Sequence, residues 1–181
     1  MAGSDPVGFP DPEVLPASGV YHPDAPRPFA EVADYLAWAE PRWAADAPRL
    51  GVITYAGAIS SGETALLDAL VRSAEATGVA PVVFWFDAAK ADAIGAIAGP
   101  AGLDVLVNLQ HLQNGAARKA EFEALGLPVL SGFVYREGDL AAWRASPTGL
   151  AAQTTAVLLA TPEAWGVSDP IVLATVDRGE T

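Results

Sequence analysis

The amino-acid sequence predicts an α/β domain built on an open, mainly parallel sheet. Short apolar segments alternate with segments whose apolar residues recur at helical spacing, a pattern typical of parallel sheets with right-handed crossovers. The clearest example is residues 50–64, LGVITYAGAISSGET, where an apolar strand runs into a small-residue loop and then a helix starting near Glu63. Such sheets bind ligands at the carboxyl ends of their strands. We therefore expect a functional site around this loop.

The first 28 residues are set apart by their proline content. Prolines occur at positions 6, 10, 12, 16, 23, 26 and 28. Proline lacks an N–H group and fixes φ, which disfavours both helix and central strand. We expect an extended arm over residues 1–28 and a single α/β domain over residues 29–181, a length sufficient to bury one core.

Five apolar segments are the predicted strands. They are residues 50–55, 80–86, 103–109, 127–132 and 170–175. The second is apolar throughout, as a strand buried on both faces should be. We expect a three-layer, flavodoxin-like or Rossmann-like arrangement with strand order 2-1-3-4-5. The strand order then reverses between strands one and three, and a ligand crevice is expected at that switch point.

Helices are predicted between these strands. They cover residues 29–40, 63–77, 88–98, 116–125, 139–145 and 150–160. Pro41 ends the first helix, Gly78 and Gly126 supply C-caps, and Asp87 is the expected N-cap of the third.

Composition excludes several functional classes. The formal net charge is −12, which argues against nucleic acid and against anionic membrane surfaces, because both are bound by clustered Lys and Arg. The chain has no cysteine, so disulfides, thiolate catalysis and Cys-ligated zinc are excluded. The acidic, Pro-rich start is no signal peptide, and the longest apolar runs are too short to span a bilayer. A cytoplasmic location is the resulting expectation.

The small-residue loop is not a known phosphate cradle. It has neither the lysine of GxxxxGK[ST] nor the spacing of GxGxxG. The loop therefore locates a site without naming its ligand, and we expect no ATPase activity from this chain.

Several segments, in order, resemble a known family. The opening GVYHPDAPRPFAEVADYLAW is similar to a "G-x-YHP … YL-x-W" lead-in. Residues 50–78 are similar to the family's strand, "SGN/D-x-A" loop and helix, and residues 82–86 and 103–132 to its next strands. Residues 141–179 resemble "EW-x-S-x-GL … ALPE-x-DG … PI". The residues in register there are Trp143, Ser146, Gly149, Leu150, Pro162, Glu163 and Gly166.

This family is the large, tetrapyrrole-binding subunit of cobaltochelatase and magnesium chelatase, the CobN/magnesium-chelatase large-subunit family. The resemblance implies a domain of that subunit, or a short relative of it, that contributes to inserting cobalt or magnesium into a tetrapyrrole during cobalamin or chlorophyll biosynthesis. It also implies partners: the remaining large-subunit domains and AAA+-type ATPase subunits. Metal insertion, a ligase reaction forming nitrogen–metal bonds, would belong to the larger complex. This chain has Ala56-Gly57-Ala58 where many members have "R-x-H".

Ten residues are candidates for ligand binding at the carboxyl edge. They are Tyr55, Ser60, Ser61, Thr64, Asn108, His111, Asn114, Arg118, Tyr135 and Arg136. The hydroxyls could bind an anionic group at a helix N-terminus or simply cap that helix. The amides could bind ligand side chains or satisfy loop backbone. The tyrosines could stack on a flat macrocycle.

The cationic candidates would face the ligand's carboxylates. His111 could contact a carboxylate or a metal, or bond to backbone. Arg136 could pair with a carboxylate. We expect an anionic ligand between residues 57–64 and 110–118, with His111 and Arg118 on a polar loop beside it. His22, the other histidine, is expected to be exposed in the arm.

No catalytic set is readable in the sequence. Two histidines and no cysteine give no nucleophile–base arrangement and no metal-ligand spacing. We therefore assign no catalytic residue, no protein-bound metal and no resident cofactor. The alternative to the chelatase interpretation is a small-molecule-binding or protein-docking α/β module without chelatase activity.

Overall fold

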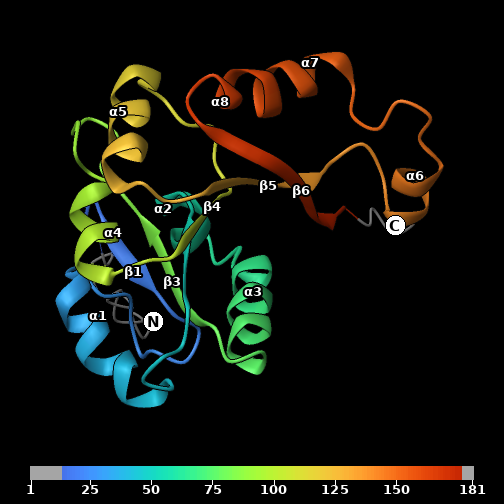
Figure 1. Ribbon diagram of the computed structural model, residues 1–181. Helices are drawn as coiled ribbons and strands as arrows, with labels where there is room; N and C mark the ends of the chain where they lie inside the picture. Colours follow the sequence, from blue (N-terminus) through green and yellow to red (C-terminus); the bar gives the residue numbers. More distant parts are fainter. Residues whose placement is uncertain (1–13, 177–181) are drawn as a thin grey trace, which may run out of the picture.

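A six-stranded sheet forms the centre of the computed structural model, which describes residues 14–176 (Figure 1). Its strands are β1 Gly19–Tyr21, β2 Arg49–Ile53, β3 Ala80–Trp85, β4 Val105–Asn108, β5 Val129–Tyr135 and β6 Val167–Thr175. They lie in the order β1-β3-β2-β4-β5-β6. All neighbouring pairs are parallel except β1 with β3. The α/β class is confirmed, and the five predicted strands lie in the predicted order.

Strand β1 was not predicted, because it lies within the proline-rich arm. Its three residues, GVY, contain no proline themselves, so they can pair with β3 at the edge of the sheet. Val20 also exchanges backbone hydrogen bonds with Phe29, and the indole of Trp85 donates to the carbonyl of Pro16. The described part of the arm is therefore packed against the sheet, whereas Pro6, Pro10 and Pro12 lie outside the described residues.

Five of the six predicted helices begin later than expected, and the one predicted over residues 116–125 begins one residue earlier. The helices are α1 Val32–Ala39, α2 Ala56–Ser60, α3 Ala65–Ala76, α4 Gly95–Ala101, α5 Gly115–Leu125, α6 Leu140–Ala145, α7 Ala152–Thr155 and α8 Thr161–Glu163, with a 3₁₀ turn, η1 Glu40–Arg42, and a π-helix, η2 Ala156–Ala160.

Three predicted elements need correction. Residues 56–60 form a short helix, where a loop was expected. Asp87 does not cap a helix: its carboxylate accepts from the N–H of Ala89 in a turn, and α4 begins only at Gly95. The helix predicted over residues 150–160 is interrupted by the π-helix η2. The start of α4 is set by a tertiary contact, because the Glu121 carboxylate accepts from the N–H groups of Ile94 and Gly95.

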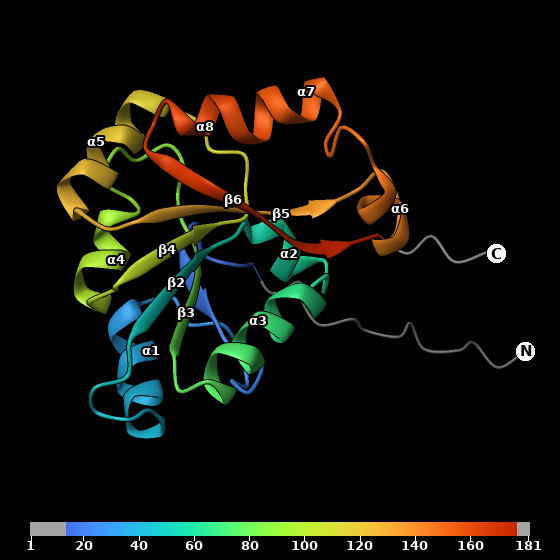
Figure 2. The ribbon, with the colours of Figure 1, turned by 45° about the vertical axis from the view of Figure 1, so that its right-hand side comes forward.

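Helices cover both faces of the sheet (Figure 2). On one face, α1, α4 and α5 enclose the largest apolar cluster, which includes Tyr35, Phe84 and Phe122. On the other face, α2 and α3 pack over β2 and β3 through a smaller cluster around Leu67 and Val71. A third cluster forms where α6, Leu150 and η2 pack on the β5–β6 pair, which extends beyond the other strands.

Candidate functional site

The carboxyl ends of the parallel strands place several predicted residues at one edge of the sheet. Strand β2 lies inside the sheet, between β3 and β4. Tyr55 follows β2, Asn108 ends β4, and Arg136 follows β5. Tyr55 is 46% exposed, so its ring is open to a ligand.

The predicted hydroxyl groups bond close to their own positions. Ser60 donates to the carbonyl of Gly57 at 3.3 Å, and Ser61 to that of Ala58 at 3.5 Å. Thr64 donates to Asp68 at 3.2 Å. Thr64 occupies the N-cap position of α3, but its hydroxyl accepts no hydrogen bond from a backbone N–H of the first turn, so the capping alternative fails there. Anion binding by these three hydroxyls stays a prediction.

The loop after β4 is shaped by Asn108. Its buried side chain donates to the carbonyl of Gln110 at 2.7 Å and accepts from that residue's N–H at 3.4 Å. This is the backbone-satisfying role of a loop amide. His111 and Asn114 are exposed farther along the same loop, and Asn114 adopts a left-handed conformation with φ 57°. Ligand contacts by these two side chains stay a prediction.

Arg118 does not lie on a polar loop, so that expectation was wrong. It lies on α5 and is fully buried. Its guanidinium donates to the carbonyl of Lys90 at 2.7 Å, forms an ion pair with Glu121 at 2.8 Å, and lies 5.0 Å from the ring centre of Phe86. Glu121 in turn accepts from the N–H of Ile94 at 2.8 Å. Both side chains therefore fix the segment between β3 and α4.

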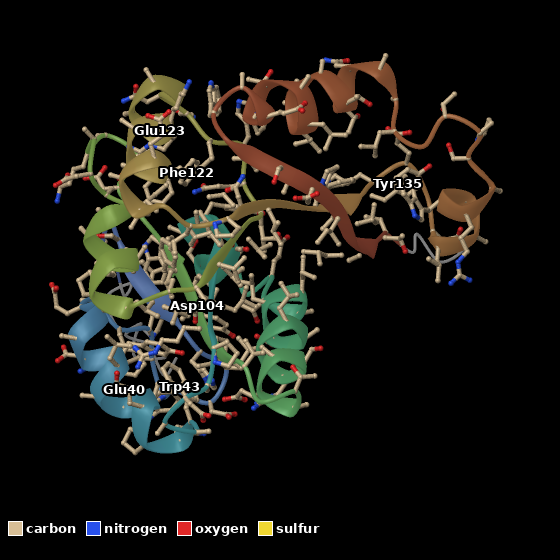
Figure 3. The ribbon with its side chains drawn as sticks, in the orientation of Figure 1. Glu40, Trp43, Asp104, Phe122, Glu123 and Tyr135 are labelled. Carbon is tan, nitrogen blue, oxygen red and sulfur yellow. The ribbon has the colours of Figure 1, made fainter. Side chains whose placement is uncertain are left out.

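Tyr135 is also directed into the fold (Figure 3). It is 4% exposed, and its ring lies 5.0 Å from that of Trp143. The face expected to stack on a macrocycle is thus in contact with another side chain.

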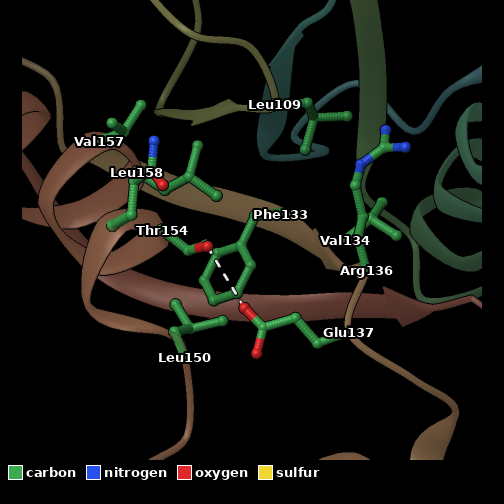
Figure 4. A pocket seen from close by; sticks show the side chains of 10 residues that line it. Leu109, Phe133, Val134, Arg136, Glu137, Leu150, Thr154, Val157 and Leu158 are labelled. Carbon is green, nitrogen blue, oxygen red and sulfur yellow. Dashed lines mark hydrogen bonds between the residues drawn. The ribbon is translucent and has the colours of Figure 1, made fainter.

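A cleft of about 450 Å³ opens beside Arg136 (Figure 4). It lies between the carboxyl half of β5 and the α7–η2 segment. Its apolar lining residues are Leu109, Phe133, Val134, Leu150, Val157 and Leu158, and its polar ones are Arg136, Glu137, Gln153 and Thr154. Pockets of this size and apolar character are typical of small-ligand sites.

Hydrogen bonds hold the helical wall of this cleft in place. The Glu137 carboxylate accepts from the N–H of Ala151 at 3.2 Å and from the hydroxyl of Thr154 at 3.3 Å, as Figure 4 shows for the second. The buried Ser131 of β5 donates to the carbonyl of Leu158 at 3.2 Å. A π-helix leaves its carbonyls differently placed from those of an α-helix and is often found at functional sites.

Comparison with known proteins gives the relationship. A family model described as CobN/Magnesium Chelatase matches residues 1–181. The chain belongs to this family. It is 32% identical over 127 residues to the aerobic cobaltochelatase subunit CobN of a Sinorhizobium species, covering 66% of this chain and 10% of that protein. It is 28% identical over 171 residues to the magnesium-chelatase H-subunit of Rhodobacter capsulatus, covering 88% of this chain and 14% of that protein.

A solved structure of the family has the same fold. The catalytic subunit of cobaltochelatase from Mycobacterium tuberculosis superposes with a TM-score of 0.60 at 22% identity, over 87% of this chain and 13% of that one. The chain thus spans only about a tenth to a seventh of the relatives' lengths. Within residues 14–176, none of the helices has the length and apolarity needed to cross a bilayer.

Most of the cleft was not predicted. Of its lining residues, only Arg136 was among the ten residues that the sequence suggested for ligand binding. Phe133 and Tyr135 alternate with Val134 along β5, so the sequence indicated that their side chains lie on opposite faces of this strand. It did not signal that residues 150–158 would fold back over one of them.

One further polar cluster joins the arm to α3. The ligand atoms of His22, Asp24 and Glu75 lie within 4.8 Å of one another, the spacing of a metal site. However, the Asp24 carboxylate already binds Arg72. His22 Nδ1 accepts from the N–H of Asp24, so the neutral ring carries its proton on Nε2, which donates to Glu75 at 3.1 Å. Both ring nitrogens are thereby used, and the cluster joins the arm to α3 through the His22–Glu75 hydrogen bond and the Asp24–Arg72 ion pair. His22 is buried, contrary to the expectation.

Proposed function

We propose that this domain contributes to tetrapyrrole binding within the large subunit of a cobalt or magnesium chelatase. ATP-driven insertion of the metal is then carried out by the complete assembly, in which the other large-subunit domains and ATPase subunits are the partners. The metal is a substrate of that assembly, and this chain alone is not the catalyst.

The observation that supports the proposal best is the cleft at the carboxyl edge of the sheet, in a chain of chelatase ancestry. Open α/β sheets bind their ligands at this edge. The cleft combines apolar walls with an exposed arginine, and the exposed ring of Tyr55 lies at the same edge. A tetrapyrrole offers matching chemistry, a flat apolar ring with acidic side chains.

The test is a titration of the purified chain with protoporphyrin IX, followed by quenching of tryptophan fluorescence. Trp143 lies next to the third apolar cluster and reports on this region. Saturable quenching at one site is expected. Quenching that rises linearly without saturation, as free tryptophan would give, would reject tetrapyrrole binding and leave a docking module as the function.

A further inference from the structure

Residues 150–160 lie across one face of β5 and cover its aromatic side chains (Figure 1). We infer that these residues form a lid, and that the face of β5 beneath the lid is the surface that a flat, apolar ring ligand meets when the lid opens. This inference rests on the proposed function and adds to it the contact surface of the ligand and the way in which the ligand enters.

The lid buries little of its own surface. In this segment, all of which the structure describes, only Leu150 is buried, and neither α7 nor η2 contains a buried residue. Cavities of about 450 and 560 Å³ lie on its two sides, the first lined by Thr154 and Leu158 and the second by Thr155 and Leu159. A segment with few buried contacts opens locally at a smaller cost than the core of the protein.

Three side-chain hydrogen bonds join the lid to β5 and to the turn after this strand. Ser131 donates to the carbonyl of Leu158 at 3.2 Å. The Glu137 carboxylate accepts from the N–H of Ala151 at 3.2 Å and from the hydroxyl of Thr154 at 3.3 Å. A single hydrogen bond contributes modestly to stability, since water replaces the partner when the bond breaks. The lid is therefore closed in this structure by bonds that are individually weak.

The two ends of the lid differ. Gly149, directly before it, has φ 70°, and glycine passes freely between this conformation and others. After the lid, Pro162 is buried, and Trp165 packs so closely on the start of α5 that a Cβ atom on Gly115 would collide with its indole. The lid thus has a hinge at its start and a fixed end, about which it can swing.

Opening of the lid exposes an aromatic face of β5. Phe133 and Tyr135 are two residues apart on this strand and lie on the same face, where they are 7% and 4% exposed beneath the lid. Phe133 and Leu150 line both cavities, so movement of the lid joins the two cavities into one apolar surface. A flat ring that covers this surface buries apolar area and stacks on Phe133.

Thiol labelling measures the opening without any ligand. The chain has no cysteine, so a single introduced thiol is the only one that iodoacetamide modifies. Ser131→Cys places the thiol beneath the lid, and Val82→Cys places it in β3, where the side chain is fully buried. Phe133→Cys repeats the measurement beneath the lid with the Ser131 hydroxyl intact.

The two positions beneath the lid should react at least about tenfold faster than position 82, because a local opening is more frequent than global unfolding. Their rates should also change little in low urea, since a local opening exposes little surface. Equal rates with equal urea dependence at all three positions would overturn the lid. Thermal melts check that each variant stays folded.

Loosening the lid tests its connection to the ligand. Glu137→Ala removes two of the three hydrogen bonds and should speed labelling at position 131 about fivefold or more. Glu123→Ala makes the same change at an exposed residue of α5 and should not. Glu137→Ala should also tighten binding of protoporphyrin IX by a similar factor, because a larger fraction of the protein is then open. Unchanged or weaker binding would show that the ring enters the closed cleft.

The outcomes separate the two proposals. If quenching of the wild-type chain saturates but labelling beneath the lid is no faster than at position 82, or Glu137→Ala does not tighten binding, the lid is wrong and tetrapyrrole binding stands. If quenching saturates neither for the wild-type chain nor for Glu137→Ala, both proposals fail.

Discussion

At the residue scale, the buried side chains of Arg118 and His22 and their acidic partners stabilise the fold. Arg118 and Glu121 fix the segment before α4. His22 joins the arm to α3 through Glu75. Arg118 was a candidate for ligand binding and His22 was expected to be exposed, yet each has partners within the protein.

His22 makes stability depend on pH. Burial lowers the pKa of its imidazole below 6.5, and the adjacent Glu75 only partly opposes this. Between the folded-state pKa and 6.5 the unfolded chain binds more protons than the folded one. The contribution of neutral His22 is therefore complete above about pH 6.5 and is lost as the pH falls through the folded-state pKa.

Urea unfolding at pH 7.5 and pH 5.5 measures this effect. The wild-type free energy of unfolding should fall between these values by more than that of His22→Gln, which cannot titrate but retains a donor and an acceptor. Equal falls in the two proteins would show that His22 is not responsible.

Replacing Arg118 should destabilise the fold. Arg118→Ala leaves the Glu121 carboxylate buried without its cation, a change that costs about 3 kcal/mol or more. Lys119→Ala, at an exposed neighbour on the same helix, should change the free energy of unfolding by less than about 0.5 kcal/mol. Equal unfolding midpoints in urea for these two variants would contradict the buried role of Arg118.

At the element scale, side-chain packing over one face of β5 depends on Gly132 having no side chain. A Cβ atom on Gly132 of β5 would lie 2.6 Å from Leu173, 2.7 Å from Leu109 and 2.9 Å from Val107. The side chains of Val107, Leu109 and Leu173 occupy the space over β5 that a side chain at this position would need. The same contact positions Leu109 at the cleft.

Two glycine substitutions should therefore have opposite effects. Gly132→Ala should lower the free energy of unfolding by about 1–3 kcal/mol through overpacking. Gly95→Ala, at the start of α4, meets nothing within 4 Å and should raise it by about 0.5–1 kcal/mol, because alanine favours helix. Chemical denaturation of both variants provides the check, and a stabilising Gly132→Ala would show that these three side chains can move aside at little cost.

The elements were predictable where apolar pattern and caps agreed. Strand order followed from five apolar runs separated by helices, and the C-cap at Gly126 was correct, with φ 64°. Strand β1 was missed because prolines lie on both sides of it in the sequence and its pairing with β3 is a tertiary contact. The start of α4 was missed because Glu121, distant in sequence, binds the N–H groups at that start.

At the scale of the whole molecule, the site was harder to predict than the fold. The sequence located the carboxyl edge and Arg136, because strand ends can be read from apolar runs. It misplaced Arg118, which falls on the inward face of α5 with Phe122. Spacing of four residues between these two was the available signal. The cleft itself depends on the return of residues 150–158 across β5, which no local pattern specifies.

The isolated chain should hydrolyse no ATP and insert no metal. Its sequence contains no GxxxxGK[ST] motif, and it spans 10% to 14% of the relatives' lengths. Phosphate release and porphyrin metallation, each measured with Mg²⁺ or Co²⁺ present, are the assays. Metallation above the rate of a protein-free blank would overturn the assignment of chemistry to the larger assembly.

The extra residue in the π-helix η2 determines which way the side chains after it face around the helix axis. One extra residue in a helical turn rotates everything after it by about 100° relative to a continuous α-helix. Within the turn, the carbonyl of Leu158 accepts from Ser131; after it, Pro162 is buried. Deleting the exposed Ala160 would restore a regular α-helix. The shortened helix would then keep either the hydrogen bond from Ser131 to Leu158 or the burial of Pro162, but not both. Length in this segment is thus as constrained as residue identity, and a one-residue deletion should harm the fold more than most substitutions there.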